Sequence, residues 1–317
     1  MRAMVQRRYG SAGVLSLEDV ATPSIDDKGV LVRIHTASVN ALDWHTMRGQ
    51  PYFMRLFLGL REPKPPIRGV DLAGRVEAVG NAITRFRPGD EVFGGCDGAL
   101  AEYVATTEDR LVSKPAGVTW AQAATLNVAA LTALQGLRDR VKVQRGQSVL
   151  VVGAGGGVGT FAVQIAKWLG ARVTAVTRTE SLELVRRLGA DDVIDHRQQD
   201  FTRSDTRFDV IFDIGGSRPM SHHRRIMAPK GVLVAIGGPP SRWFGPADRL
   251  IKAMVLPRMM PFVAKSNAAD RALLAELVEQ GALKPVIDRT YPLREAEEAI
   301  AYVGAGHPRG KVVVEID

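Results

Sequence analysis

The chain contains 317 residues, of which 45% are hydrophobic and 24% are charged. These proportions are those of an ordinary globular protein, and they exclude a disordered chain and a collagen-like repeat. At roughly 150 residues per domain, the length predicts two domains, each with its own hydrophobic core.

The charged residues make the chain basic but are dispersed along it. There are 42 Lys and Arg against 34 Asp and Glu, which gives a formal net charge of +8. The densest basic cluster, residues 222–225, is short and lacks the interleaved aromatic side chains of a base-stacking surface. We therefore expect a solvated helix face there and no nucleic-acid partner.

The cysteine content and the apolar segments bear on the cellular compartment. The single cysteine, Cys96, can form no internal disulfide, and we interpret it as a small buried residue. No apolar run approaches the ~20 residues needed to cross a bilayer, and residues 1–10 lack the apolar core of a signal peptide. These observations predict a cytoplasmic protein with no membrane partner.

The first third of the chain has the pattern of a β domain. Residues 30–36 alternate between apolar and polar side chains, and residues 71–79 and 91–93 are further β-prone segments. The turn at residues 87–90 separates strands. We expect strands at these three segments.

From residue 120 onward, helices and strands are expected to alternate. Residues 121–137 are rich in Ala and Leu and are predicted to be helical, and residues 148–152 predict a buried parallel strand. Further helices are expected at residues 158–169 and 181–188, and further strands at residues 172–177, 193–194, 208–213 and 232–236. This alternation predicts an α/β fold, a doubly wound parallel sheet with helices on both faces.

The C-terminal part predicts two more helices, at residues 268–280 and 295–303, and a last strand at residues 311–316. No helix follows this strand. We therefore expect it to return to the N-terminal β domain, which makes the α/β domain an insertion.

A glycine loop, residues 153–159, joins the expected buried strand to the next helix. A dinucleotide pyrophosphate meets a helix N-terminus at this place in doubly wound folds. The spacing is G-x-x-G-x-x-G, and the usual G-x-G-x-x-G is not met. Glycine costs roughly 1 kcal/mol within a helix start, so five glycines in seven positions favour a ligand over a bare loop. The residues expected to line the pyrophosphate are Gly153, Gly155, Gly156, Gly157, Val158 and Gly159.

The end of the second strand of this domain predicts which cofactor binds. Thr177 and Arg178 stand there, and an Arg at this place pairs with the 2′-phosphate of NADPH. Glu180 lies three residues after Thr177, in a Thr-x-x-Glu capping box that gives it a structural task. This pattern favours NADPH over NADH, and the alternative is that Arg178 is a solvated loop charge.

Together these segments resemble the medium-chain dehydrogenase/reductase superfamily, specifically its zinc-free, quinone-oxidoreductase-like branch. The resemblance runs nearly from end to end, and the G-x-x-G-x-x-G loop is that branch's own variant. The motifs that carry it are residues 38–44, 69–74, 86–94, 101–103, 131–134, 153–167, 189–195, 284–288 and 309–314.

The resemblance implies a GroES-like catalytic domain, residues 1–121, completed by residues 285–317. Residues 122–284 would then form an inserted Rossmann domain, with NADPH in the cleft between the two domains and commonly a homodimer. Zinc-dependent relatives carry a Cys and a Gly-His-Glu where Asp43 and Gly69-Val70-Asp71 stand here, and their four-Cys lobe is missing. We therefore expect no metal.

The resemblance also assigns roles to single residues. It places Asn40 beside the nicotinamide and the reactive oxygen, and Thr132 at the nicotinamide ribose. Gly237 and Lys311 are further expected cofactor residues. His196, where relatives often have Tyr, either contacts the adenosine end of the cofactor or faces solvent.

Three aromatic or apolar features are further candidates for the substrate site. Tyr52 is a candidate proton donor or acceptor clamp, or else an exposed loop aromatic. Residues 53–57 are a candidate lid. Residues 254–262 either line an apolar substrate pocket or form core or dimer contacts.

The expected chemistry is hydride transfer to an activated acceptor. Without a metal to polarise a carbonyl, quinones and α,β-unsaturated carbonyls are suitable acceptors, because the charge that develops is delocalised onto oxygen. The predicted function is therefore NADPH-dependent reduction of a quinone or enone. The alternatives are a metal-free NADP-dependent alcohol dehydrogenase and a non-catalytic NADPH-binding redox sensor.

Overall fold

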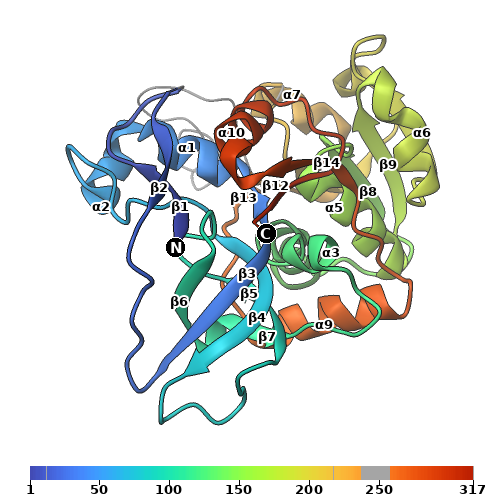
Figure 1. Cartoon of the computed structure of the whole chain (residues 1–317). Coiled ribbons are helices and arrows are strands. Elements are labelled where there is room, and N and C mark those ends of the chain that lie inside the picture. Colours follow the sequence, from blue (N-terminus) through green and yellow to red (C-terminus); the bar gives the residue numbers. More distant parts are fainter. Residues whose placement is uncertain (12, 217, 237–257, 317) are drawn as a thin grey trace. The chain divides into compact units, whose positions relative to one another are not determined.

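The computed structural model describes residues 1–11, 13–216, 218–236 and 258–316 (Figure 1). The chain divides into two compact units. The first unit contains residues 1–129, 266–281 and 285–317, and the second contains residues 130–265 and 282–284. Among the described residues, no helix has the length and apolarity that a membrane span requires.

The first unit is built on a seven-stranded sheet. Its order is β14 (Ile287–Pro292), β15 (Lys311–Glu315), β3 (Gly29–Val39), β4 (Asp71–Val79), β5 (Glu91–Gly95) and β7 (Leu111–Ser113), with β6 (Tyr103–Thr107) also paired to β3. A separate antiparallel pair is formed by β1 (Arg2–Gln6) and β2 (Leu15–Asp19). β15 pairs antiparallel with β3, which confirms that the last strand returns to the N-terminal sheet.

Alternating burial along β3 shows why this segment is a strand. Val30, Val32 and Ile34 are buried in the core of the first unit, whereas Arg33 between them is exposed. Two helices complete this core, α1 (Ala41–Arg48) directly after β3 and α10 (Ala296–Gly304), which packs on α1 and β15. The strand thus delivers its last residues to the start of α1.

Residues 121–137 are largely helical, as predicted, but the helix is interrupted. The chain forms α3 (Trp120–Ala124), then α4 (Val128–Gln135), which continues into a π-helical segment, Gly136–Arg140. Asn127 leaves the helical path because its side-chain Nδ2 donates to Asp71 Oδ1 at 2.9 Å. Ala and Leu content could not predict this break, because the acceptor is 56 residues away in the sequence.

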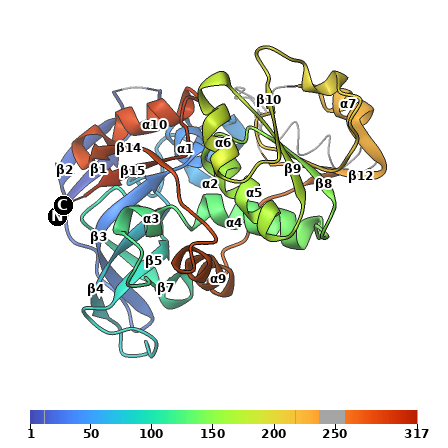
Figure 2. The ribbon, with the colours of Figure 1, turned by 90° about the vertical axis from the view of Figure 1, so that its right-hand side faces the viewer.

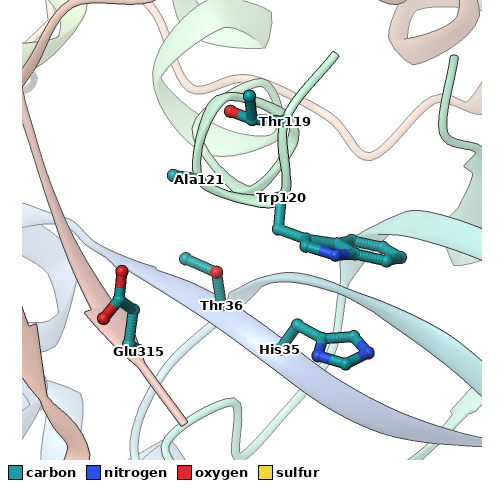
Figure 3. A pocket seen from close by; sticks show the side chains of 6 residues that line it. All are labelled: His35, Thr36, Thr119, Trp120, Ala121 and Glu315. Atoms are coloured by element: carbon teal, nitrogen blue, oxygen red, sulfur yellow. The ribbon is translucent and has the colours of Figure 1, made fainter. Parts of the chain in front are cut away.

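A hollow of about 400 Å³ lies where α3 faces β3 and β15 (Figure 3). His35 and Trp120 stack there with ring centroids 4.6 Å apart, and the Lys114 ammonium lies 4.8 Å from the Trp120 ring centroid. Thr36 and Glu315 line the same hollow from paired positions of β3 and β15. The stack anchors the first turn of α3 on the sheet and thereby the segment that leads to Asn127.

The second unit is a six-stranded parallel sheet (Figure 2). Its order is β10 (Asp192–Asp195), β9 (Arg172–Thr177), β8 (Ser148–Val152), β11 (Phe208–Asp213), β12 (Met227–Ala235) and β13 (Met259–Pro261). α5 (Gly157–Trp168) packs on β8 and β9, and α6 (Leu182–Arg187) packs on β10. The predicted doubly wound, Rossmann-like sheet is confirmed, and strand order reverses between β8 and β11, where such sheets bind ligands.

Two sequence predictions fall wholly or partly outside the described residues. Gly237 and residues 254–257 are not described. Within the remainder of the apolar segment, Met259–Pro261 forms β13, and Met259 is buried in the core of the second unit. This part of the segment therefore has the core role that was one of its two interpretations.

Candidate cofactor and substrate sites

The glycine loop turns the chain sharply between β8 and α5. Gly153 has a φ of +85°, a conformation that favours glycine, and its N–H donates to Val176 O at 3.0 Å. Gly156 is the N-cap of α5, and the helix begins at Gly157. The first amide groups of α5 are therefore presented beyond the carboxyl end of β8.

The glycines of the loop serve two purposes. A Cβ on Gly159 would lie 2.2 Å from Gly153 O, and one on Gly155 would lie 2.6 Å from Thr177 Oγ1, so both positions require glycine for packing. For a Cβ on Gly156, the nearest atom across the loop would be Gly153 O at 3.5 Å, an ordinary van der Waals contact. Packing does not explain Gly156, whereas a phosphate approaching the helix N-terminus does. The residues present thus fit a dinucleotide pyrophosphate.

The ends of β9 and β10 form the second part of this candidate cofactor site. His196 N donates to Thr177 O at 3.1 Å, which holds the two strand ends together. Arg178 is half-buried and is the N-cap of the short helical turn Thr179–Ser181. Arg178 and His196 thus follow neighbouring strands. The sequence predicts that Arg178 pairs with the 2′-phosphate, and it leaves open whether His196 contacts the cofactor or faces solvent.

The expected capping box between Thr177 and Glu180 is wrong. The N-cap of this turn is Arg178, without a side-chain capping hydrogen bond, and the Glu180 carboxylate instead pairs with Arg197 at 2.6 Å. Glu180 was expected to cap a helix together with Thr177, and it instead forms an ion pair with Arg197. Its negative charge is matched by Arg197.

In the first unit, the predicted catalytic residue Asn40 lies at the junction of β3 and α1. It is the N-cap of α1 and is 7% exposed. Its Nδ2 donates to Asp71 Oδ2 at 2.8 Å, and its Oδ1 accepts from Lys311 Nζ at 2.7 Å. The strand register explains this arrangement, since Ser38 of β3 pairs with Asp71 of β4, and Val39 pairs with Val312 of β15.

Asp71 is the centre of this polar cluster and is fully buried. Its Oδ2 also accepts from Ser38 Oγ at 2.8 Å, and its Oδ1 accepts from Asn127 Nδ2 at 2.9 Å and from Val128 N at 3.2 Å. Lys311 Nζ lies 3.6 Å from Asp71 Oδ2. Each carboxylate oxygen is therefore used by at least two donors.

Two members of this cluster were missed by sequence reasoning. Asn127 contacts Asp71, and Arg271 of α9 (Ala268–Glu279) donates from Nη1 to Asn127 Oδ1 at 3.2 Å and from Nη2 to Asp109 O at 2.8 Å. Arg271 is fully buried. Sequence offered no signal for these contacts, because 144 residues separate Asn127 from Arg271.

The donor set of this cluster does not fit a zinc ion. Asp71 already accepts four hydrogen bonds, and the Lys311 ammonium stands where a further cation would be repelled. Burial raises the pKa of the Cys96 thiol well above its ordinary value, so it is a poor thiolate ligand. Within the described ranges, no three His, Cys, Asp or Glu side chains gather as a metal-binding group.

Asp43 is the second buried carboxyl group near Asn40. Its Oδ2 accepts from the Asn40 backbone N–H at 2.7 Å, which closes the first turn of α1. Burial, assisted by the charge of Asp71, raises the pKa of Asp43 from its ordinary 3.8 to about 6, against the backbone hydrogen bond and the charges of Lys311 and Arg68. Asp43 therefore acts as a structural acceptor at the start of α1.

Tyr52 and Thr132 are placed on different elements. Tyr52 is half-buried in the helical turn Tyr52–Met54, and the Arg55 guanidinium carbon lies 4.9 Å from its ring centroid. In the same segment Phe53 is 44% exposed and Phe57 is 81% exposed. Thr132 lies on α4 and is 8% exposed. The proton-donor, lid and ribose-binding roles stay predictions.

Comparison with known proteins assigns the family. Residues 26–116 match the model of the alcohol dehydrogenase GroES-like domain, and residues 188–314 match that of the zinc-binding dehydrogenases. The chain is 33% identical over 329 residues to the chloroplastic NADPH-dependent alkenal/one oxidoreductase of Arabidopsis thaliana, covering 99% of this chain and 79% of that protein. It is 32% identical over 335 residues to the chloroplast envelope quinone oxidoreductase homolog of the same plant, covering 99% and 98%.

A solved structure agrees with these sequence relatives. The quinone oxidoreductase from Coxiella burnetii matches with a TM-score of 0.88 at 28% identity, over 100% of this chain and 99% of that chain. The sheet topologies, the glycine loop and these likenesses define an oxidoreductase with a GroES-like and a Rossmann-like part. The chain belongs to the medium-chain dehydrogenase/reductase superfamily, in its zinc-free, quinone-oxidoreductase-like branch.

Two glycine substitutions separate packing from ligand binding in the loop. Gly159→Ala should lower the free energy of unfolding by roughly 1–3 kcal/mol, because its methyl group overlaps Gly153 O. Gly156→Ala should cost less than about 1 kcal/mol, as expected for a change at an N-cap. It should nevertheless weaken dinucleotide binding about tenfold, equivalent to ~1.4 kcal/mol. Urea unfolding measures the stability of both variants, and fluorescence titration measures their affinity for the dinucleotide. A wild-type affinity in Gly156→Ala would contradict the phosphate-binding role of Gly156.

The raised pKa of Asp43 predicts a pH-dependent stability. Between pH 4 and 6 the folded protein keeps a proton on Asp43 that the unfolded chain releases, so the free energy of unfolding falls as pH rises through this window. Asp43→Asn should remove this loss. The free energy of unfolding of the variant, relative to that of wild type, should therefore be roughly 2–3 kcal/mol higher at pH 7 than at pH 4. Urea unfolding at both pH values measures it, with the exposed Asp19→Asn as control. If the free energies of unfolding of variant and wild type differ by the same amount at pH 4 and at pH 7, the raised pKa of Asp43 is refuted.

Proposed function

We propose that the protein transfers a hydride from NADPH to a quinone or an α,β-unsaturated carbonyl compound. The observation that carries this proposal is that one chain contains both a glycine loop that fits a dinucleotide pyrophosphate and a polar cluster around Asn40. This cluster holds a hydrogen-bonding side chain and does not have the donor set of a zinc site. The names of the alkenal/one and quinone oxidoreductase relatives support the substrate class.

The glycine loop would hold the cofactor pyrophosphate on the first amide groups of α5. Arg178 and His196 would contact the 2′-phosphate, and Thr132 would fix the nicotinamide ribose. When bound, NADPH supplies the hydride. The protein's own task is then to orient the acceptor and to stabilise the negative charge that develops on its oxygen.

Asn40 is suited to bind that oxygen. Its Nδ2 carries two hydrogens, of which one is used by Asp71 Oδ2 at 2.8 Å. The other has only a long contact, 3.4 Å, to Ser38 O. We propose that this second hydrogen is donated to the oxygen of the acceptor. Tyr52 remains the candidate that supplies the proton completing the reduction, so that acceptor, NADPH and one proton give the dihydro product and NADP⁺.

Compartment and assembly complete the proposal. The Arabidopsis relatives are named as chloroplast proteins, and those names describe those proteins. For this chain we propose a cytoplasmic location and a homodimer. Fractionation of cells and light scattering of the purified protein test them.

Cofactor preference tests the role of Arg178. We expect quinone turnover with NADPH to exceed that with NADH by at least about tenfold, because a charged pair with the 2′-phosphate contributes ~1.5–3 kcal/mol. Arg178→Glu should reduce kcat/KM for NADPH and leave that for NADH unchanged or higher. Arg172→Glu, an exposed change at the opposite end of β9, is the matched control. Equal use of both nucleotides by the wild-type protein would contradict the assignment.

An acceptor panel tests the substrate class. Consumption of NADPH, followed optically, should be fast with quinones and enones and near background with saturated aldehydes and ketones, because only conjugated acceptors delocalise the developing charge. NADP⁺-dependent oxidation of simple alcohols that survives chelators would favour the alcohol dehydrogenase alternative. Tight NADPH binding without turnover of any acceptor would favour the redox sensor.

A further inference from the structure

We propose that Lys311, together with Asp71, is a positioning residue that fixes the side-chain amide of Asn40 in one orientation for the reduction of the acceptor. This inference rests on the proposed function, because it gives a task to the ammonium group at the residue proposed to bind the acceptor. The sequence analysis expected Lys311 to bind the cofactor, and we propose this positioning role in place of that one.

The Lys311 ammonium is enclosed by acceptors of the first unit. The residue is 2% exposed. Its Nζ donates to Asn40 Oδ1 at 2.7 Å and to Val39 O at 3.2 Å, and it lies 3.6 Å from Asp71 Oδ2. An ammonium group has three donor hydrogens, and two of them are used by Asn40 Oδ1 and Val39 O. The contact with Asp71 Oδ2 at 3.6 Å is an ion pair rather than a hydrogen bond. Because the residue is almost completely buried among these three oxygens, its ammonium is not presented to a phosphate or a ribose.

The two partners of Asn40 are chemically opposite and allow only one orientation of its amide. The oxygen end faces a cation with donor hydrogens, and the nitrogen end faces a carboxylate that can only accept. A 180° flip would set the NH₂ group against the ammonium and the carbonyl oxygen against the carboxylate. Each flipped contact would lose a charge-assisted hydrogen bond and add repulsion. The pair therefore fixes which atom of Asn40 is available to a ligand.

The carboxylate in this pair is itself immobile. Asp71 Oδ1 is held by Asn127 Nδ2 at 2.9 Å and by Val128 N at 3.2 Å, and Arg271 Nη1 holds Asn127 from its other side at 3.2 Å. Lys311 comes from β15, and β15 is fixed by its antiparallel pairing with β3. Both partners of the Asn40 amide thus belong to rigid parts of the same sheet.

The charge of Lys311 is needed as well as its hydrogen bonds. Burial lowers the pKa of Lys311, while Asp71 and Asp43 act in the opposite direction and favour the charged ammonium. Removal of the ammonium would leave the buried Asp71 carboxylate without the cation nearest to it. We therefore expect a loss of orientation at Asn40 together with a loss of stability, and the test must separate the two.

A double-mutant cycle tests the coupling between Lys311 and Asn40. Lys311→Met should lower kcat for a quinone or enone by about 10- to 100-fold, the scale expected from a misplaced reacting group. The dissociation constant of NADPH, from fluorescence titration, should change less than about threefold. In an Asn40→Ala background, Lys311→Met should change kcat less than about threefold, because the residue it positions is gone. Equal effects in both backgrounds, or a large loss of NADPH affinity, would overturn the inference.

Two further measurements separate positioning from folding and from the proposed function. Lys311→Met/Asp71→Asn removes both charges and should keep a melting temperature near that of wild type, yet should retain the loss of kcat. Wild-type kcat in this variant would overturn the inference. The side-chain amide NMR signals of Asn40, identified by their absence in Asn40→Ala, should shift in Lys311→Met without any substrate present. If the wild-type protein reduces no acceptor, the proposed function fails. If the Asn40 signals do not shift in Lys311→Met, the positioning role of Lys311 is overturned, whatever the outcome of the activity assays.

Discussion

The buried carboxylate of Asp71 is the constraint on which the first unit depends. An ionised carboxylate that is removed from water costs several kcal/mol unless hydrogen bonds and a nearby cation replace its hydration. Here the replacement comes from Ser38 and Asn40, from the Asn127 segment between α3 and α4, and from Lys311 on β15. These segments lie far apart in the sequence, so the sheet can bury Asp71 only when all of them are in place. The orientation of Asn40 is then a consequence of folding rather than a separate adjustment.

In the second unit, the corresponding constraint is that the backbone of the glycine loop must allow an anion to approach it closely. Gly155 and Gly159 bring loop, helix and strand together at distances that a side chain would forbid, whereas Gly156 leaves space beside the first turn of α5. A helix N-terminus offers unpaired N–H groups and a positive end of the dipole, which suit a pyrophosphate. One unit thus carries the features expected for the nucleotide, and the other carries the polar side chains expected for the acceptor.

Sequence patterns predicted the elements whose cause is local and failed where the cause is distant. The strands at residues 71–79, 148–152, 172–177 and 208–213 have the predicted bounds, because continuous or alternating apolar runs decide them. The helix break before α4 and the true partner of Glu180 depend on Asp71 and Arg197, which no local pattern indicates. The glycine loop and Asn40 were found from motif and resemblance. Arg271 was missed because its contacts are created only by the packing of α9.

The most direct test of the account is to follow the hydride itself. The protein should be supplied with NADPH carrying deuterium at one or the other face of nicotinamide C4, together with an enone, and the product examined by NMR. Direct transfer predicts that deuterium from one face only appears at the β-carbon of the saturated carbonyl product. A product without deuterium from either face, although NADPH is consumed, would contradict the account.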